Sequence, residues 1–479
     1  MPRRPAPILP SVPEALTEGF ERLRRELGVP EEFPDEVVAA AEQAAANPRL
    51  PQTDRTDLEL VTIDPPGAKD LDQAVFIERT GDGFTVWYAI ADVAAFVDPG
   101  GPIDAEAHRR GQTFYAPHQR TPLHPPVLSE GAASLLPDQV RPALLWRLQL
   151  DEQGDCSDPE VVRALVRSRQ QLTYEQVQEQ LDTGTASESL QLLREVGRLR
   201  EQIEKDRGGV SLNIPEQEVH TGEESGTGTW SLSFRTPLPI EGWNAQISLL
   251  TGMAAAHLML YAQVGILRTL PPADNRSLRR LRNTARALGI NWPAEMDYPE
   301  FVRSLDAREG RDAAMLYACT TLFRGAGYQA FSGSVPNQVE HSALAIEYAH
   351  CTAPLRRLVD RYSGEICVAI CADQPVPEWV LRELDGLADT MAESDRRAKK
   401  YERGIVDLTE ALLLSDRVGQ QFRGTIVEVD EEGGRGRLML AEPAVEANVR
   451  GRQLPLGQEV SATLTRADVS TGETAFEVG

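Results

Sequence analysis

The chain has 479 residues, 41% of them hydrophobic and 25% charged, which excludes an intrinsically disordered sequence and leaves room for about two to four domains. Its formal net charge of -24 excludes a uniformly basic surface, although one local basic groove remains compatible with that value. Five cysteines without a C-x-x-C pair exclude a disulfide scaffold and a structural zinc site, and they favour a reducing cytoplasm.

The first 50 residues are predicted to be helical and to form a region separate from the rest of the chain. Apolar residues recur at helical spacing over 13–26 and 34–46, and Gly28-Val29-Pro30 between them is typical of a turn. We expect residues 1–50 to form either a small helix-turn-helix-like unit or an extension that packs on the next domain. Residues 1–10 lack the apolar run of a signal peptide.

Three carboxylates, Asp64, Asp70 and Asp72, lie within nine residues in the stretch T-I-D-P-P-G-A-K-D-L-D-Q-A at 62–74. Apolar residues on both sides predict short buried strands, so the acids are expected at strand ends. Carboxylates this close repel one another unless a cation neutralises them, and Mg²⁺ prefers oxygen ligands. The cluster therefore indicates either a metal site that handles phosphate esters or a polar turn at a proline-glycine corner. A calcium loop fits badly, because Val75 stands where that loop requires glycine.

The middle of the chain mixes strands and helices. Residues 74–79 and 84–91 are predicted strands joined by a hairpin turn at 81–83. Most of 155–205 is charged and predicted helical, with one helix opening at 172–175, whereas 209–236 is predicted to be extended. Helices are expected to dominate 241–414. The run 247–267 contains no acid, lysine or arginine and could span a bilayer, but its polar and small residues favour a helix buried on all sides.

The last 60 or so residues have a different pattern. Short strands are predicted at 422–429, 435–440, 458–464 and 474–478, separated by glycine-rich turns. Short strands at regular spacing predict a compact β-barrel.

Five stretches in a fixed order resemble the ribonuclease II family of bacterial 3'-to-5' exoribonucleases. The resemblance covers roughly residues 55–415 and the terminal barrel. It implies a mixed α/β fold: a small helical N-terminal domain at 1–50, an RNB-type catalytic domain with a central sheet and many helices at 51–415, and an OB-fold RNA-binding barrel of the ribosomal-protein S1 type at 416–479. The five stretches are T-I-D-P-P-G-A-K-D-L-D-Q-A (62–74), A-I-A-D-V (89–93), D-A-E-A-H-R-R-G-Q-T-F-Y-A-P (104–117), Y-A-H-C-T-A-P-L-R-R-L-V-D (348–360) and R-R-A-K-K-Y-E-R (396–403).

The resemblance also implies a set of catalytic and metal-binding residues. Asp64, Asp70 and Asp72 match the first three carboxylates of the family's metal cluster. Gln73 stands where the fourth, usually aspartate, is expected; its carbonyl oxygen carries no charge, so the second metal position should be weakened. Arg356 matches the arginine that contacts the phosphate near the scissile bond, and Asp72 and Arg356 are the predicted catalytic residues.

Further residues are implied in RNA binding. Tyr115 and Tyr174 match aromatic residues that pack against nucleotides at the 3' end, Arg356 contacts phosphate, and Glu402 resembles a glutamate near the end of the bound RNA. The family's usual N-terminal cold-shock barrels do not fit into about 50 mostly helical residues.

The resemblance thus implies a metal-dependent 3'-to-5' exoribonuclease that hydrolyses single-stranded RNA to 5'-mononucleotides with two Mg²⁺ ions, for which Mn²⁺ can substitute. We expect a cytoplasmic monomer without membrane association. Gln73 motivates an alternative, a catalytically weakened RNA-binding member of the same family. A third interpretation makes the acids a stabilising cation site in a scaffold protein.

Overall fold

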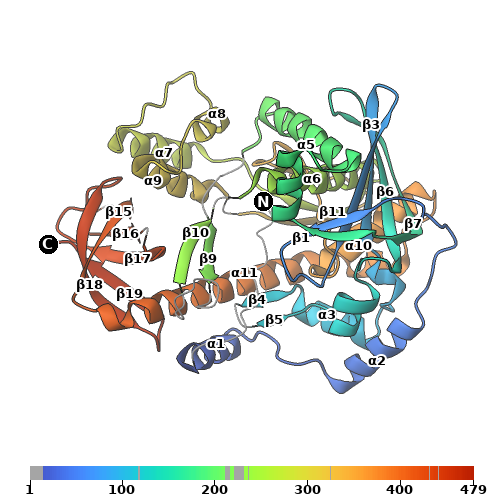
Figure 1. The fold of residues 1–479 in the computed structure, drawn as a ribbon, viewed down its shortest axis with the longest axis horizontal. Coiled ribbons are helices and arrows are strands. Elements are labelled where there is room, and N and C mark those ends of the chain that lie inside the picture. Colours follow the sequence, from blue (N-terminus) through green and yellow to red (C-terminus); the bar gives the residue numbers. More distant parts are fainter. Residues whose placement is uncertain are drawn as a thin grey trace.

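The computed structural model of the chain describes residues 14–116, 119–210, 216–220, 231–235, 237–323, 325–430, 432–440 and 442–479. A mixed α/β body with a six-stranded sheet lies at one end of the molecule and a closed five-stranded barrel at the other (Figure 1). The long helix α11 (Glu378–Leu414) runs between them. The predicted mixed α/β fold with a central sheet and a C-terminal barrel is confirmed.

The central sheet has the strand order β7-β6-β3-β2-β1-β8 and is antiparallel except for the parallel pair β1 and β8. The predicted hairpin is present between β2 and β3, and its turn includes Gly81 at a φ of +62°. The strands are β1 (Val61–Asp64), β2 (Gln73–Thr80), β3 (Gly83–Ala91), β6 (Val140–Leu150), β7 (Cys156–Arg167) and β8 (Gln170–Thr173).

The helix predicted across 156–167 was wrong, because this segment is the edge strand β7. Its partner β6 covers one edge only, and much of its N-terminal half is exposed, so charged residues are tolerated there. The high charge content of residues 156–167 is therefore explained by the exposed face of a strand. The helix predicted to open at 172–175 is confirmed as α4 (Tyr174–Thr183).

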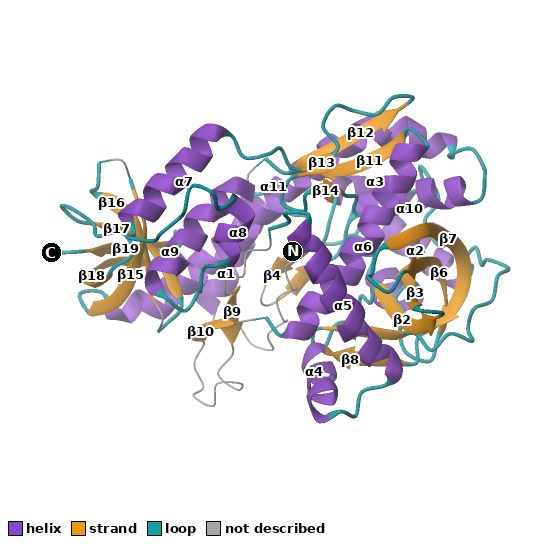
Figure 2. Cartoon of the chain, turned by 90° about the horizontal axis from the view of Figure 1, so that it is seen from above, coloured by secondary structure: helices purple, strands orange, loops and turns teal. Residues whose placement is uncertain are grey.

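Both faces of the sheet are covered, and the pleat divides the residues of each strand between two cores. Val75 and Ile77 of β2 point into one core, whereas Ala74 of the same strand belongs to the other. The first core contains α5 (Glu188–Asp206), α6 (Pro239–Tyr261) and α10 (Leu358–Cys371), of which α5 and α6 lie beside the sheet in Figure 2. The second contains α2 (Asp35–Ala46) and α3 (Pro102–Arg110).

Helix α6 occupies most of the apolar run at 247–267, and all but a few of its side chains from Gln246 to Met259 are buried. The predicted buried helix is therefore confirmed as far as Met259, whereas its last residue, Tyr261, is exposed; β11 (Val264–Thr269) begins after it. In the part of the chain that the structure describes, no helix has both the length and the apolar character needed to cross a membrane.

The two N-terminal helices pack at different places. Helix α1 (Glu14–Glu26) lies along α11, where Gly19 faces Leu408 and Gly404 faces Leu23, so that the absence of side chains allows a close approach. Helix α2 packs against α3 and the one-turn π-helix η2 (Leu128–Ala132). Each helix thus covers a different part of the larger body. The boundary at residue 50 remains a prediction.

The C-terminal barrel closes in the order β15-β16-β17-β19-β18 around buried residues such as Leu438 and Phe476. The strand β17 was not predicted, although its sequence V-E-A-N-V-R alternates apolar and polar residues. Three helices pack on the barrel beside β15 (Figure 1). The elements are β15 (Gln421–Val429), β16 (Arg435–Leu440), β17 (Val445–Arg450), β18 (Glu459–Asp468), β19 (Glu473–Glu477), α7 (Asn275–Ala287), α8 (Tyr298–Arg303) and α9 (Gly310–Cys319).

Short antiparallel strand pairs complete the fold as small hairpins and ribbons. They are β4 (Phe114–Ala116) with β5 (Gln119–Thr121), β9 (Glu216–His220) with β10 (Ser231–Arg235), β11 with β12 (Gly327–Ser332), and β13 (Glu340–His341) with β14 (Ile346–Glu347). Strands β9 and β10 agree with the extended structure predicted for 209–236, much of which lies outside the described residues.

Candidate active site

The three aspartates meet at one end of the central sheet. Asp64 is the last residue of β1, and Asp72 immediately precedes Gln73, the first residue of β2. Because β1 and β2 are antiparallel, the last residue of β1 and the first residue of β2 lie at the same end of the sheet, joined by the loop that carries Asp70. The local pattern of buried strand residues therefore gathers the carboxylates.

Asp72 is buried and Asp64 is half-buried, and both carboxyl groups bind protons more tightly than usual. Burial raises the pKa of Asp64 to about 7, and the charge of Asp70 acts in the same direction. Burial also raises the pKa of Asp72 to about 8, although Arg356 nearby opposes this shift. Asp64 Oδ2 is buried without a hydrogen-bond partner. In the metal-free site, burial therefore favours the neutral form of both carboxyl groups.

The loop before α10 supplies the positive charge closest to Asp72. The Leu355 N–H donates to Asp72 Oδ1 at 2.8 Å, and Arg356 Nε lies 3.3 Å from Asp72 Oδ2. Asp360, in the first turn of α10, accepts a hydrogen bond from the Ala353 N–H at 2.7 Å and thereby fixes the loop to the helix. The two predicted catalytic residues, Asp72 and Arg356, are therefore in direct contact.

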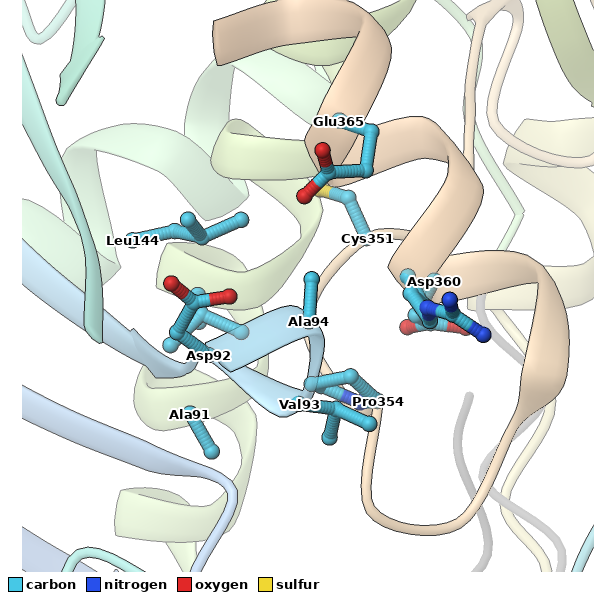
Figure 3. Close-up of a pocket in the computed structure, with 11 residues that line it drawn as sticks. Ala91, Asp92, Val93, Ala94, Leu144, Cys351, Pro354, Asp360 and Glu365 are labelled. Carbon is cyan, nitrogen blue, oxygen red and sulfur yellow. The ribbon is translucent and has the colours of Figure 1, made fainter. Parts of the chain in front are cut away.

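A small cavity lies beside this loop, and Asp92 and Glu365 both line it (Figure 3). Arg163 of β7 pairs with both, at 2.9 Å from Asp92 Oδ2. The cavity is lined on the loop side by Cys351 and Pro354. These ion pairs tie the sheet to α10 and thereby support the loop that carries Arg356.

Gln73 uses both ends of its amide group within the protein. Its Nε2 donates to the Thr352 carbonyl oxygen at 2.5 Å, and its Oε1 accepts a hydrogen bond from the Tyr88 hydroxyl at 2.6 Å. Thr352 is also held by Ser248, whose hydroxyl lies 2.8 Å from the Thr352 hydroxyl. Gln73 therefore bridges the sheet and the loop of Arg356.

The β4–β5 hairpin brings Tyr115 and Arg120 to the site. These two residues face each other across the hairpin, and the Thr113 N–H before it donates to the Arg356 carbonyl oxygen at 3.0 Å. The Tyr115 hydroxyl is buried without a hydrogen-bond partner, and burial together with Asp70 raises its pKa. Arg120 forms an ion pair with Asp70.

Tyr174 reaches the site through the parallel pairing of β1 and β8, in which Asp64 pairs with Thr173. Thr173 caps α4 in a capping box with Gln176, so the helix starts at Tyr174 beside the carboxylates. Burial raises the pKa of the Tyr174 hydroxyl to about 12, and Asp64 adds to this shift. The structure thus brings Tyr115 and Tyr174 to the same cluster from two sides.

Glu402 is the glutamate that the resemblance implies near the end of the bound RNA. It lies on α11 next to Tyr401, which packs in the core between α1, α11 and the β4–β5 hairpin. Its predicted role toward RNA stays a prediction.

The oxygen donors fit a hard divalent cation. Asp64 offers a buried oxygen without a hydrogen-bond partner, and Asp70 lies close enough to raise the pKa of both Asp64 and Asp72. Over the described residues, however, no three His, Cys, Asp or Glu side chains are arranged to hold a metal ion, and Asp70 is paired with Arg120. Asp64, Asp70 and Asp72 would hold a cation. For Gln73 to act as a further ligand, its carbonyl oxygen would first have to lose the hydrogen bond from the Tyr88 hydroxyl.

Comparison with known protein families agrees with this geometry. Residues 52–370 match the RNB domain, and residues 420–479 match the RNase II-type exonuclease C-terminal S1 domain. The chain belongs to the RNB-domain family. The resemblance to the ribonuclease II family is thereby confirmed, and the barrel β15–β19 is the S1-type domain of this RNB protein.

Among curated relatives, the RNB chain is 27% identical over 428 residues to Ribonuclease R of Escherichia coli, covering 84% of the chain and 51% of that relative. It is 27% identical over 424 residues to Ribonuclease R of Aquifex aeolicus and over 425 residues to Exoribonuclease 2 of Serratia proteamaculans, covering 59% and 63% of their lengths. The chain therefore spans about half to three-fifths of the relatives that it matches.

Solved structures show the same fold. Mycoplasma genitalium RNase R in complex with ribose methylated single-stranded RNA superimposes with a TM-score of 0.85 at 21% identity, covering 97% of this chain and 78% of that one. Yeast Ssd1, described as a pseudonuclease, superimposes with a TM-score of 0.73 at 17% identity, covering 94% of this chain and 58% of that one. The fold of RNB proteins is thus shared by nucleases and by a pseudonuclease.

The sequence analysis did not identify Arg120, Tyr88 or Thr352 as parts of the site. Arg120 follows Tyr115 by five residues, and only the hairpin register brings the two face to face. Tyr88 lies in the middle of an apolar strand and was expected only in the core. The signal that could have identified it is a hydroxyl on the strand next to β2, and using that signal requires the β2–β3 register.

Proposed function

We propose that this chain is a metal-dependent 3'-to-5' exoribonuclease that hydrolyses single-stranded RNA to 5'-mononucleotides. The observation that carries the proposal is the contact between buried Asp72 and Arg356 at the end of the sheet where Asp64 and Asp70 also lie. A guanidinium next to buried carboxylates provides a fixed positive charge for a phosphate and leaves oxygen ligands for cations. The names of the relatives, ribonuclease R and exoribonuclease 2, support the same substrate class.

In this proposal Asp64, Asp70 and Asp72 hold Mg²⁺, with Mn²⁺ as a substitute. Two such ions, when bound, supply an activated water and stabilise the leaving oxygen. The protein's own part is to orient the phosphate through the planar fork of Arg356 and to exclude water around Asp64 and Asp72 by burial. Gln73 would lend only a neutral oxygen to the second position.

Tyr115 and Tyr174 would stack on the last bases at the 3' end. Each stacking contact contributes about 1–3 kcal/mol with little sequence preference, which suits an enzyme that removes any nucleotide. The two tyrosines come from different elements, β4 and the start of α4. The S1-type barrel would hold the strand further from the site.

Digestion of 3'- and 5'-end-labelled single-stranded RNA, with Mg²⁺ and separately with Mn²⁺, tests this function. The expected result is release of 5'-mononucleotides from the 3' end and loss of release in Asp72→Asn. No mononucleotides with either metal, or the same release from Asp72→Asn, would reject it. The matched control is Asp98→Asn, since Asp98 is exposed in an ion pair with Arg49 outside the site.

A second candidate is an RNA-binding member of the family with weakened catalysis. The hydrogen bonds of Gln73 to Thr352 and Tyr88 favour it, because they occupy the residue that stands in a metal-ligand position. This candidate predicts retention of labelled RNA in a fluorescence anisotropy assay, no turnover, and no gain of turnover in Gln73→Asp. Turnover by the unmodified protein would eliminate it.

A further inference from the structure

Arg120 divides its guanidinium between two carboxylates on different elements. Its Nη1 forms an ion pair with Asp70 Oδ1, and its Nη2 lies 3.6 Å from Glu130 Oε1 on the π-helix η2. The side chains of Arg120 and Asp70 are each only 14% exposed, so the pair is well shielded from bulk water. An ion pair in such a position resists screening by salt.

This pair sits where a cation would be needed. Asp64 and Asp72 lie at the same end of the sheet as Asp70, so neutralising Asp70 reduces the repulsion among the three carboxylates. Arg120 performs that neutralisation from within the protein. A divalent cation that takes Asp70 as a ligand must displace a guanidinium of the same sign of charge.

The strands β4 and β5 are anchored at the base of the hairpin, so the proposed change concerns the Arg120 side chain. Phe114 of β4 is buried in the core with α1 and α11, and the Leu123 N–H after β5 donates to the Thr113 hydroxyl at 3.0 Å. The Thr113 N–H is itself bonded to the Arg356 carbonyl oxygen. With both ends of the hairpin anchored, the guanidinium can exchange Asp70 for Glu130 by rotating about its own side-chain bonds.

We propose that Arg120 is a positioning residue that competes with a divalent cation for Asp70, and that Glu130 accepts its guanidinium when the cation binds. The inference rests on the proposed metal-dependent function and deepens it. Arg120 keeps the aspartate cluster folded and charge-balanced without metal, and it sets how much cation is needed before Asp70 becomes a ligand. Glu130 lowers that requirement because the displaced guanidinium keeps an ion partner.

The test measures Mn²⁺ binding to the full chain without RNA, by electron paramagnetic resonance of free Mn²⁺ and by calorimetry. Arg120→Gln should bind Mn²⁺ about tenfold more tightly, since the competing charge is removed. Glu130→Gln should bind it about threefold more weakly, because the displaced guanidinium loses its acceptor. In the metal-free protein, Arg120→Gln should also lower Tm and increase the rise in Tm on adding Mn²⁺.

The matched control is Arg147→Gln, which removes an exposed pair with Glu160 elsewhere on the sheet and should leave Mn²⁺ affinity unchanged. If Arg120→Gln does not fold, Arg120→Lys keeps one charge without the fork and should bind Mn²⁺ with intermediate affinity. Equal or weaker Mn²⁺ binding by Arg120→Gln, or tighter binding by Glu130→Gln, would overturn the proposal. If the predicted order of affinities holds but labelled RNA is not digested, the proposed function fails and this inference stands.

Discussion

The bridge from Tyr88 through Gln73 to Thr352 gives a prediction whose size can be worked from the contacts. Tyr88 is 1% exposed, and its hydroxyl donates to Gln73 Oε1 at 2.6 Å. Tyr88→Phe removes this bond and leaves the Gln73 carbonyl without its donor, so the free energy of unfolding should fall by about 1–3 kcal/mol. Gln73→Leu also breaks the bond to Thr352 and should cost about as much or more.

The two substitutions should not be additive. The double variant Tyr88→Phe/Gln73→Leu removes both the donor and the acceptor of the Tyr88–Gln73 hydrogen bond. Neither group of that bond is then left buried without a partner. We expect a coupling energy of about 1 kcal/mol between the two positions, since residues in direct contact share their loss. Such coupling would identify Gln73 as a structural bridge in the protein without metal.

Urea unfolding in EDTA, followed by tryptophan fluorescence and circular dichroism, measures these differences. The control is Tyr298→Phe, because the Tyr298 hydroxyl is buried without a hydrogen-bond partner and its removal should cost nothing or stabilise the protein. If Tyr88→Phe is as harmless as Tyr298→Phe, or if the double variant equals the sum of the single ones, the reasoning about Gln73 is refuted.

Three other predictions concern proton binding, the reaction and the packing of α1. Burial raises the pKa of Asp64 to about 7 and of Asp72 to about 8. Above pH 4 the native protein therefore binds more protons than the unfolded chain. The free energy of unfolding of the metal-free protein should thus fall as the pH rises from about 4 to 8. Asp72→Asn should make that slope shallower in urea titrations at several pH values, and an unchanged slope would contradict the shift. Arg356→Gln should lower the rate of mononucleotide release at saturating RNA by about a hundredfold or more. RNA affinity is measured separately by fluorescence anisotropy. If only the affinity falls, Arg356 has no role in the reaction itself. Phe20→Ala, in the core that joins α1 to α11, should lower the free energy of unfolding by about 3–5 kcal/mol, and a near-neutral effect on thermal unfolding would show that α1 does not brace α11.

Much of this site was readable in the sequence because its information is local. Asp64, Asp70 and Asp72 fall within one short stretch, and the apolar alternation on both sides determines which strands carry them. The glycine-rich turn at 81–83 specified the β2–β3 hairpin, and short strands at even spacing indicated the small closing barrel. In each case the interacting residues are neighbours in the chain, so propensity and periodicity are enough.

What remained beyond the sequence depends on contacts between residues far apart in the chain. Gln73 meets Thr352 across 279 positions, and Arg120 meets Asp70 across 50. Neither pairing leaves a periodic signal, because a side chain's partner is set by strand order, hairpin register and the loop before α10. The sequence alone determined which groups carry charge and where the two strands beside the aspartates, β1 and β2, meet them. Only the tertiary structure decided that an arginine neutralises Asp70 and that an amide, at the place of a fourth carboxylate, ties the sheet to the loop of Arg356.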